Sequence, residues 1–171
     1  MKSPLNDSGR FKLIIPPLAV GANKVMCDLF NASSLTLTVR SVCATPNLDT
    51  AVVGALGVRY SLTRTTTVGT GGTAATVNGV NPVAPVISSL SGTDALPTGI
   101  TARSAPTGGA TAGAVLGTRQ VFTEETSAAS IDKSYSALDE VCVIPPNTGI
   151  RFVQGTEAGL GSVGFEVVVG V

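Results

Sequence analysis

The sequence predicts an all-β protein: an antiparallel β-sandwich, with a jelly roll as the preferred topology and a long irregular arm inserted between strands. Composition is the first reason, because valine, threonine, alanine and glycine dominate while aromatic residues make up 4% and charged residues 13%. The second is that several segments alternate between apolar and polar residues, with glycine and proline between them. The length of 171 residues predicts a single domain over 1–171, large enough for a real core.

The clearest alternation predicts three strands, because a half-buried strand points successive side chains to opposite faces. They cover residues 35–40, 58–63 and 163–171. In the last, valines and Phe165 form one apolar face, and the other face is mixed. These segments should supply much of the core.

Five weaker strand candidates raise the expected total to about eight short strands. They are residues 11–15, 24–30, 115–125, 140–144 and 149–156. The proline pairs at 16–17 and 145–146 are predicted to end strands, because proline removes a hydrogen-bond donor from the ladder. Residues 127–140 give a helical hint, with apolar residues at helical spacing.

The arm is predicted over residues 68–114, a segment rich in threonine, glycine and proline that contains few large apolar side chains. Ordering its backbone costs about 1 to 2 kcal/mol per residue, and burying a large apolar side chain returns at most about 1.5 to 3 kcal/mol. Because the cost exceeds the gain, the arm is not expected to become ordered without contacts outside itself. The sequence therefore predicts that it contacts other molecules, together with an extended N-terminal segment over residues 1–10. The alternative is a mobile surface loop.

Charge and hydropathy limit the partners. Lysine and arginine number 11, as do aspartate and glutamate, so no net field attracts nucleic acid or an anionic membrane. The start of the chain is polar and no apolar run is long enough to span a bilayer. We therefore expect a soluble product made in a cytoplasm, with neither nucleic acid nor membrane as partner.

The three cysteines are expected to be small core residues. Cys27, Cys43 and Cys142 cannot all pair within one chain, and their spacing does not suggest a zinc site. A Cys27–Cys43 disulfide is the alternative.

Enzymatic chemistry is not expected. The chain contains no histidine, so the commonest general base and the commonest metal ligand are both missing. Glu124 and Glu125 are adjacent and would point to opposite faces of a strand. The glycine run at 68–73 lacks the lysine and the helix context of a phosphate loop, and the sequon at Asn31 is expected to stay unmodified. We predict no catalytic residues, no cofactor and no metal.

Arginine is the residue type most suited to interface contacts here, since its guanidinium can make two hydrogen bonds at once. The candidate intersubunit or partner contacts are Arg10, Arg64, Thr65, Thr66 and Arg103. Ordinary solvated strand faces are the alternative for each arginine taken singly.

Four runs carry a family resemblance: SLTRTTTVGTGGTAAT at 61–76, LPTGITARSAPTGGAT at 96–111, VFTEETS at 121–127 and IPPNTGIRFVQG at 144–155. With them the chain resembles small tailed-bacteriophage virion structural proteins of the capsid decoration or cement type. The resemblance runs from about Leu62 to the C-terminus. It is most specific at 64–66 and 102–109, and residues 1–10 lie outside it.

The resemblance implies a homo-oligomer, with a trimer favoured, that binds the major capsid protein on the exterior of the virion. The alternative is a tail-associated adhesin or receptor-binding module that recognises host surface glycan. Glycan platforms usually use exposed aromatic rings, and this chain has no tryptophan and only two tyrosines, which disfavours that alternative.

Overall fold

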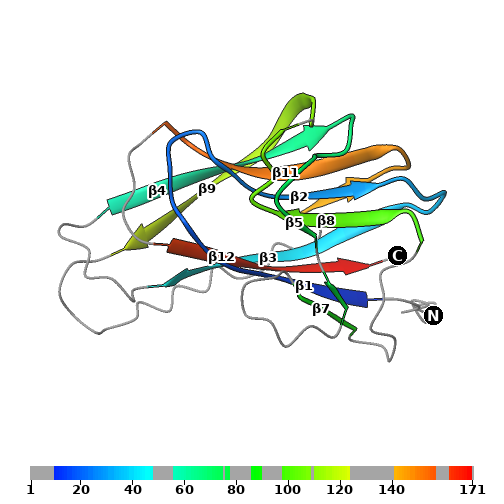
Figure 1. Ribbon diagram of the computed structural model, residues 1–171, viewed down its shortest axis with the longest axis horizontal. Helices are drawn as coiled ribbons and strands as arrows, with labels where there is room; N and C mark the ends of the chain where they lie inside the picture. Colours follow the sequence, from blue (N-terminus) through cyan, green and yellow to red (C-terminus); the bar gives the residue numbers. More distant parts are fainter. Residues whose placement is uncertain are drawn as a thin grey trace, which may run out of the picture.

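The computed structural model describes residues 10–47, 56–74, 76–77, 86–89, 98–108, 110–123, 141–156 and 162–170. They form two β-sheets that pack face to face as a sandwich (Figure 1). The strands are β1 (Arg10–Ala19), β2 (Val25–Asn31), β3 (Leu37–Asn47), β4 (Leu56–Thr65), β5 (Thr73–Ala74), β6 (Thr76–Val77), β7 (Val86–Ser89), β8 (Ile100–Ser104), β9 (Ala112–Thr123), β10 (Cys142–Ile144), β11 (Thr148–Gln154) and β12 (Ser162–Gly170). The all-β sandwich prediction is confirmed, and the described part of the chain contains no helix that could cross a membrane.

The strand order follows a nested pairing. The first sheet has the order β10-β3-β12-β1-β7-β6, and the second sheet has the order β5-β8-β2-β11-β4-β9. Antiparallel pairs join β1 to β12, β2 to β11, β3 to β10 and β4 to β9, so strands from the two ends of the chain pair progressively inward. The pairs β12–β3 and β11–β4 then complete the two sheets. The chain therefore behaves as one long hairpin folded over on itself, with residues 66–111 inserted at its tip.

The inserted segment extends both sheets beside β1 and β2. Strand β8 pairs with β2 and carries β5 on its other side, whereas β7 pairs with β1 and carries β6 in parallel. Ile100 and Ala102 of β8 are 8% and 3% exposed and belong to the core. The expectation of an irregular arm over 68–114 is therefore wrong for β8, which is a strand of the sandwich. Pairing also covers the free edge of β2, which would otherwise expose a row of backbone groups.

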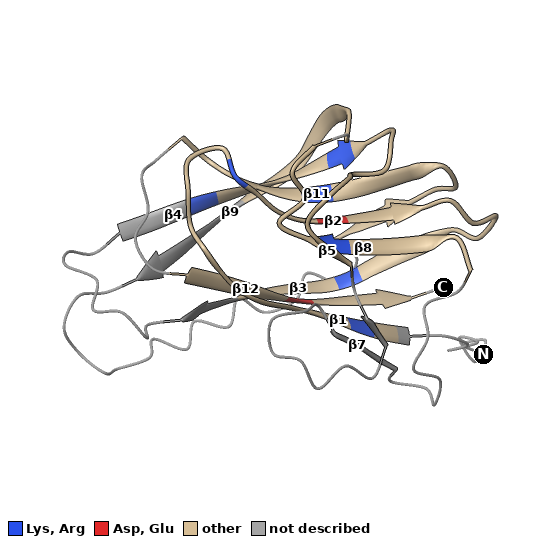
Figure 2. Cartoon of the chain, in the orientation of Figure 1, with Lys and Arg blue, Asp and Glu red and all other residues tan. Residues whose placement is uncertain are grey.

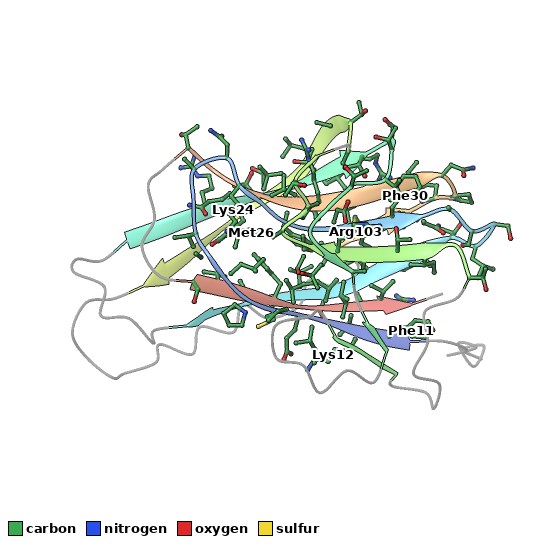
Figure 3. All side chains as sticks on the ribbon, in the orientation of Figure 1. Phe11, Lys12, Lys24, Met26, Phe30 and Arg103 are labelled. Atoms are coloured by element: carbon green, nitrogen blue, oxygen red, sulfur yellow. The ribbon has the colours of Figure 1, made fainter. Side chains whose placement is uncertain are left out.

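The core lies between the sheets and follows the alternation read from the sequence. Valines of β12 and the apolar side chains of β1, β2 and β11 fill it, and Met26 points between the two sheets (Figure 3). Phe165 of the first sheet packs edge to face on Tyr60, with ring centroids 5.2 Å apart, and stacks on Phe152 at 5.1 Å. These ring contacts join the two sheets directly.

Most predicted strands are confirmed, and the exceptions have local causes. Strand β1 continues through Pro16 and Pro17, where its pairing with β12 shifts register, so the prediction that this pair ends a strand is wrong. A bulge accommodates proline because it interrupts the ladder that proline cannot complete. The second proline pair does follow the end of β10. The helical hint at 127–140 and the segment 1–9 lie outside the described residues.

The prediction of a core residue is confirmed for Cys27 and is wrong for Cys43. Cys43 is half-buried and lies opposite Glu166 of β12, beyond a register shift that breaks its shared alternation with Leu37 and Val39. Cys27 is buried and is a free thiol, so the alternative Cys27–Cys43 disulfide is wrong. Burial raises the pKa of the Cys27 thiol well above its usual range, and the neighbouring Asp28 raises it further. Cys142 is a half-buried free thiol whose pKa is raised by burial and lowered by Arg64. Cys27 is therefore a packing residue rather than a nucleophile.

Candidate functional site

Two loops of the inserted segment lie against each other on the outer face of the second sheet, and we call the described residues of 66–72 and 105–111, all except Gly109, the paired loops. The Thr70 amide donates to the Gly108 carbonyl at 2.6 Å, and the Thr107 amide donates to the Thr70 carbonyl at 3.0 Å. Nearer the strands, the Thr111 amide donates to Thr67 Oγ1 at 2.7 Å. The threonine and glycine stretch that follows β4 is thus ordered by backbone pairing within the chain.

Close backbone approach explains the glycines of the paired loops. Gly72 has a φ of 64°, and a Cβ there would overlap the Ser104 carbonyl oxygen. Ala105 has a φ of 45° although it is not glycine, which is a strained conformation for an alanine that precedes a proline. Its amide donates to the Met26 carbonyl at 2.9 Å, which fixes the point where the second loop leaves β8.

Beneath the paired loops, one row of polar side chains crosses the second sheet. Asp28 of β2 lies opposite Arg103 of β8 on one side and opposite Arg151 of β11 on the other. Thr63 of β4 continues the row beyond Arg151. Figure 2 shows the acidic position of β2 between basic positions of its two neighbours. Because Cys27 and Leu29 face the core, the intervening Asp28 faces outward, under the loops.

The two arginines of this row hold the loops to the sheet. Arg103 Nη1 donates to the Gly71 carbonyl at 3.2 Å, and Arg151 Nη1 donates to the Ala110 carbonyl at 3.2 Å. Each loop therefore receives one guanidinium hydrogen bond from a different strand. Charged donors make stronger hydrogen bonds than neutral ones, so these contacts should restrict the motion of both loops.

Asp28 is 2% exposed, although it carries a carboxyl group. Burial raises the pKa of this carboxyl, and the effect exceeds that of the Gly69 amide, Arg103 and Arg151, which lower it. The Gly69 backbone lies so close that a Cβ there would overlap Asp28 Oδ2. Glycine at position 69 is therefore needed for the loop to lie over the carboxyl group.

The outward surface of the paired loops is polar and uncharged. No residue in 66–72 or 105–111 carries an ionisable side chain. The exposed side chains include Thr66, Thr67, Thr70, Thr107 and Thr111. The first loop also exposes one apolar residue, Val68 at 38%, and Val115, close to the second loop in the sequence, is 61% exposed. Such a surface suits contact with a neutral partner surface rather than with an ion or a polyanion.

The structure separates the predicted contact residues. Thr66 belongs to the paired loops and Arg103 to the row that supports them. Thr65 is 1% exposed and lies on the same face of β4 as Thr63, covered by the loops. Arg64 Nη2 donates to the Val143 carbonyl of β10 at 3.0 Å, on the opposite face of β4. For Arg10 the structure describes only the backbone, at the start of β1.

Sequence reasoning missed Asp28 and overlooked the role of Arg151. The available signal was the polar position of Asp28 between Cys27 and Leu29, in a strand whose neighbouring residues are apolar. No pattern in the sequence indicated that Asp28 pairs with positions 103 and 151, because these residues are far apart along the chain.

Among the described residues, no group of three or more metal-binding side chains of the histidine, cysteine, aspartate or glutamate type comes together. Comparison of the chain with protein-family models, with curated proteins and with solved structures finds no match. The proposal below therefore depends on the residues, the fold and the sequence resemblance.

Proposed function

We propose that this protein is a non-enzymatic virion structural protein, a head decoration or cement protein that binds the capsid exterior as a homo-oligomer, with a trimer favoured. The observation that carries the proposal is the paired loops: a polar, uncharged surface held in place by Arg103 and Arg151. The sequence resemblance supports it independently, because its most specific parts, 64–66 and 102–109, lie in or beside these loops.

The topology proposed for the sandwich is a jelly roll. Its support is the nested pairing of eight strands, four in each sheet: β1, β12, β3 and β10 in the first, and β2, β11, β4 and β9 in the second. A jelly roll contains eight strands in two sheets and is common among viral capsid proteins. The strands β5 to β8 are then additions to the edges of the roll.

The mechanism is mass action on the assembled lattice. A protein that binds only the mature capsid stabilises it by its own free energy of binding. Several copies of the paired loops in one oligomer would raise the apparent affinity, because the second contact forms at a high effective concentration. Loops that are already ordered lose less conformational entropy on binding than a disordered arm would. The major capsid protein is the partner in this proposal.

The direct test is rebinding to capsids stripped of this protein. We expect Thr70→Arg and Thr107→Arg to fold normally and to lose most binding, because each places a charge on the exposed loop surface. The matched control is Ala22→Arg, which adds the same side chain to the exposed turn between β1 and β2. Normal binding by both loop variants would contradict the assignment of the paired loops.

Copy number separates this function from its alternative. Hundreds of copies per virion would support decoration, whereas a handful would support a tail-associated adhesin that recognises glycan. Light scattering of the purified chain gives the oligomeric state, for which we expect a trimer. Because the loop surface is uncharged, capsid binding should change little between about 0.05 and 0.5 M salt.

A further inference from the structure

The acidic group beneath the paired loops has unusual surroundings. No hydrogen bond of good geometry reaches either carboxylate oxygen of Asp28 from the described residues, although the Gly69 amide lies near enough to lower its pKa. The Nε atoms of its two cross-strand neighbours, Arg103 and Arg151, are also buried without a partner. An ionised carboxylate is stable in the interior only when nearby charges and hydrogen bonds replace its lost hydration. The charges and hydrogen bonds around Asp28 replace its lost hydration only in part.

The incomplete compensation has a geometric cause. Arg103 and Arg151 use an Nη1 atom to hold the loop carbonyls of Gly71 and Ala110, so these donors are directed at the loops. Their positive charges and the Gly69 amide lower the pKa of Asp28, but burial is the larger effect and raises it. The closed arrangement therefore raises the pKa of Asp28 above that of an exposed carboxyl group.

Asp28 is the group whose titration changes the charge under the paired loops between acid and neutral pH. The loops contain no ionisable side chain, and the Gly69 amide is what they present to Asp28. The groups that face it from β8 and β11 are the guanidinium groups of Arg103 and Arg151. On β2, the Cys27 thiol lies on the opposite face, and its pKa is raised, away from the acid range.

The burial of Asp28 depends on the loops themselves, since Gly69 lies directly against the carboxyl group. Lifting the loops would hydrate the carboxylate, so closed loops bind a proton more tightly than open loops do. We propose that Asp28 is a proton-sensitive latch: the ionised form loosens the paired loops, and the protonated form lets them close on the second sheet. The added stability is fully present below the pKa of the open state. It is lost as the pH rises through the higher pKa of the closed state.

The latch is tested by amide hydrogen exchange, followed by NMR and expressed as protection factors for residues 66–72 and 105–111. In the full chain we expect protection to rise as the pH falls from about 7 to 4, by up to about tenfold for each pKa unit that separates closed from open loops. Asp28→Asn keeps the shape and removes the titration, so its profile should be flat. The control Glu166→Gln removes a carboxylate that pairs with Lys12 on the first sheet, and it should keep the pH dependence.

Two results would overturn the latch: protection in the unmodified chain that does not change with pH, or a pH dependence that persists in Asp28→Asn. If Asp28→Asn does not fold, titration of the Asp28 carboxyl carbon in the unmodified chain decides by NMR. A midpoint above about 3.9, the value for an exposed aspartate, supports the latch, and a midpoint at or below it rejects the latch. These readouts are independent of capsid binding, so failure of the proposed function would leave them unchanged.

Discussion

At the residue scale, Asn31 shows how one polar side chain joins two turns of the sandwich. It is fully buried, and its Nδ2 donates to the carbonyls of Leu35 at 2.7 Å and Ile144 at 3.1 Å. Its Oδ1 accepts from the Ser33 amide at 3.1 Å and from Ser33 Oγ at 2.6 Å. The glycosylation motif at this position therefore supplies a structural asparagine, and the folded chain does not present it to a modifying enzyme.

We expect Asn31→Ala to lower the free energy of unfolding by about 1–3 kcal/mol, because it leaves the buried carbonyl oxygen of Ile144 and the part-buried carbonyl oxygen of Leu35 without this donor. Chemical denaturation measures this change. Ser34→Ala, at an exposed position of the same turn, is the control and should have little effect. Equal stability of the two variants would contradict the role given to Asn31.

A substitution at Ala105 is expected to raise the free energy of unfolding, whereas the one at Asn31 lowers it. Glycine adopts its φ of 45° without the steric cost that alanine meets, although glycine loses more backbone entropy on folding. We expect Ala105→Gly to raise the free energy of unfolding by about 0.5–1 kcal/mol. Ala102→Gly, in the neighbouring strand β8 and 3% exposed, should instead lower it. Thermal denaturation of the two variants distinguishes relief of local strain from a general effect of glycine.

At the element scale, the first of the paired loops can lie on β2 only because Gly69 and Asp28 fit together. Gly69→Ala places a methyl group on the carboxyl of Asp28, so we expect it to destabilise the chain by about 1–3 kcal/mol. Truncation of the partner in Gly69→Ala/Asp28→Ala should remove part of that cost. A double-mutant cycle measures the coupling, expected at about 0.5–3 kcal/mol. Strict additivity would show that the two residues do not meet.

At the scale of the whole molecule, Phe165 joins the sheets through its contacts with Tyr60 and Phe152. Phe165→Ala should lower the free energy of unfolding by about 3–5 kcal/mol, a large share of the total for a domain of this kind. Val168→Ala changes the same strand at a half-buried position on the outer face and should cost much less. Denaturation midpoints compare the two. Similar losses would show that the core does not depend on this aromatic cluster.

Removal of residues 68–114 also acts on the whole molecule. The segment contains β8, so its removal would take Ile100 and Ala102 from the core and expose the edge of β2. We expect the shortened chain to be less stable and to self-associate, because an open edge of backbone donors and acceptors pairs with other chains. Light scattering and denaturation check both effects. A monodisperse chain of unchanged stability would show that the core does not need residues 68–114.

The sequence by itself determined the eight strands outside the inserted segment and most of the core, because period-two alternation records which face of each strand is buried. It also indicated that the threonine and glycine stretch after β4 begins a long segment with few large apolar side chains. Only the tertiary structure decided that β8 joins the sheet, since its apolar residues are too few to predict burial without β2 beside them. The same holds for Asp28, Arg103 and Arg151: antiparallel register brings them into one row, and the sequence carries no local record of register between distant strands.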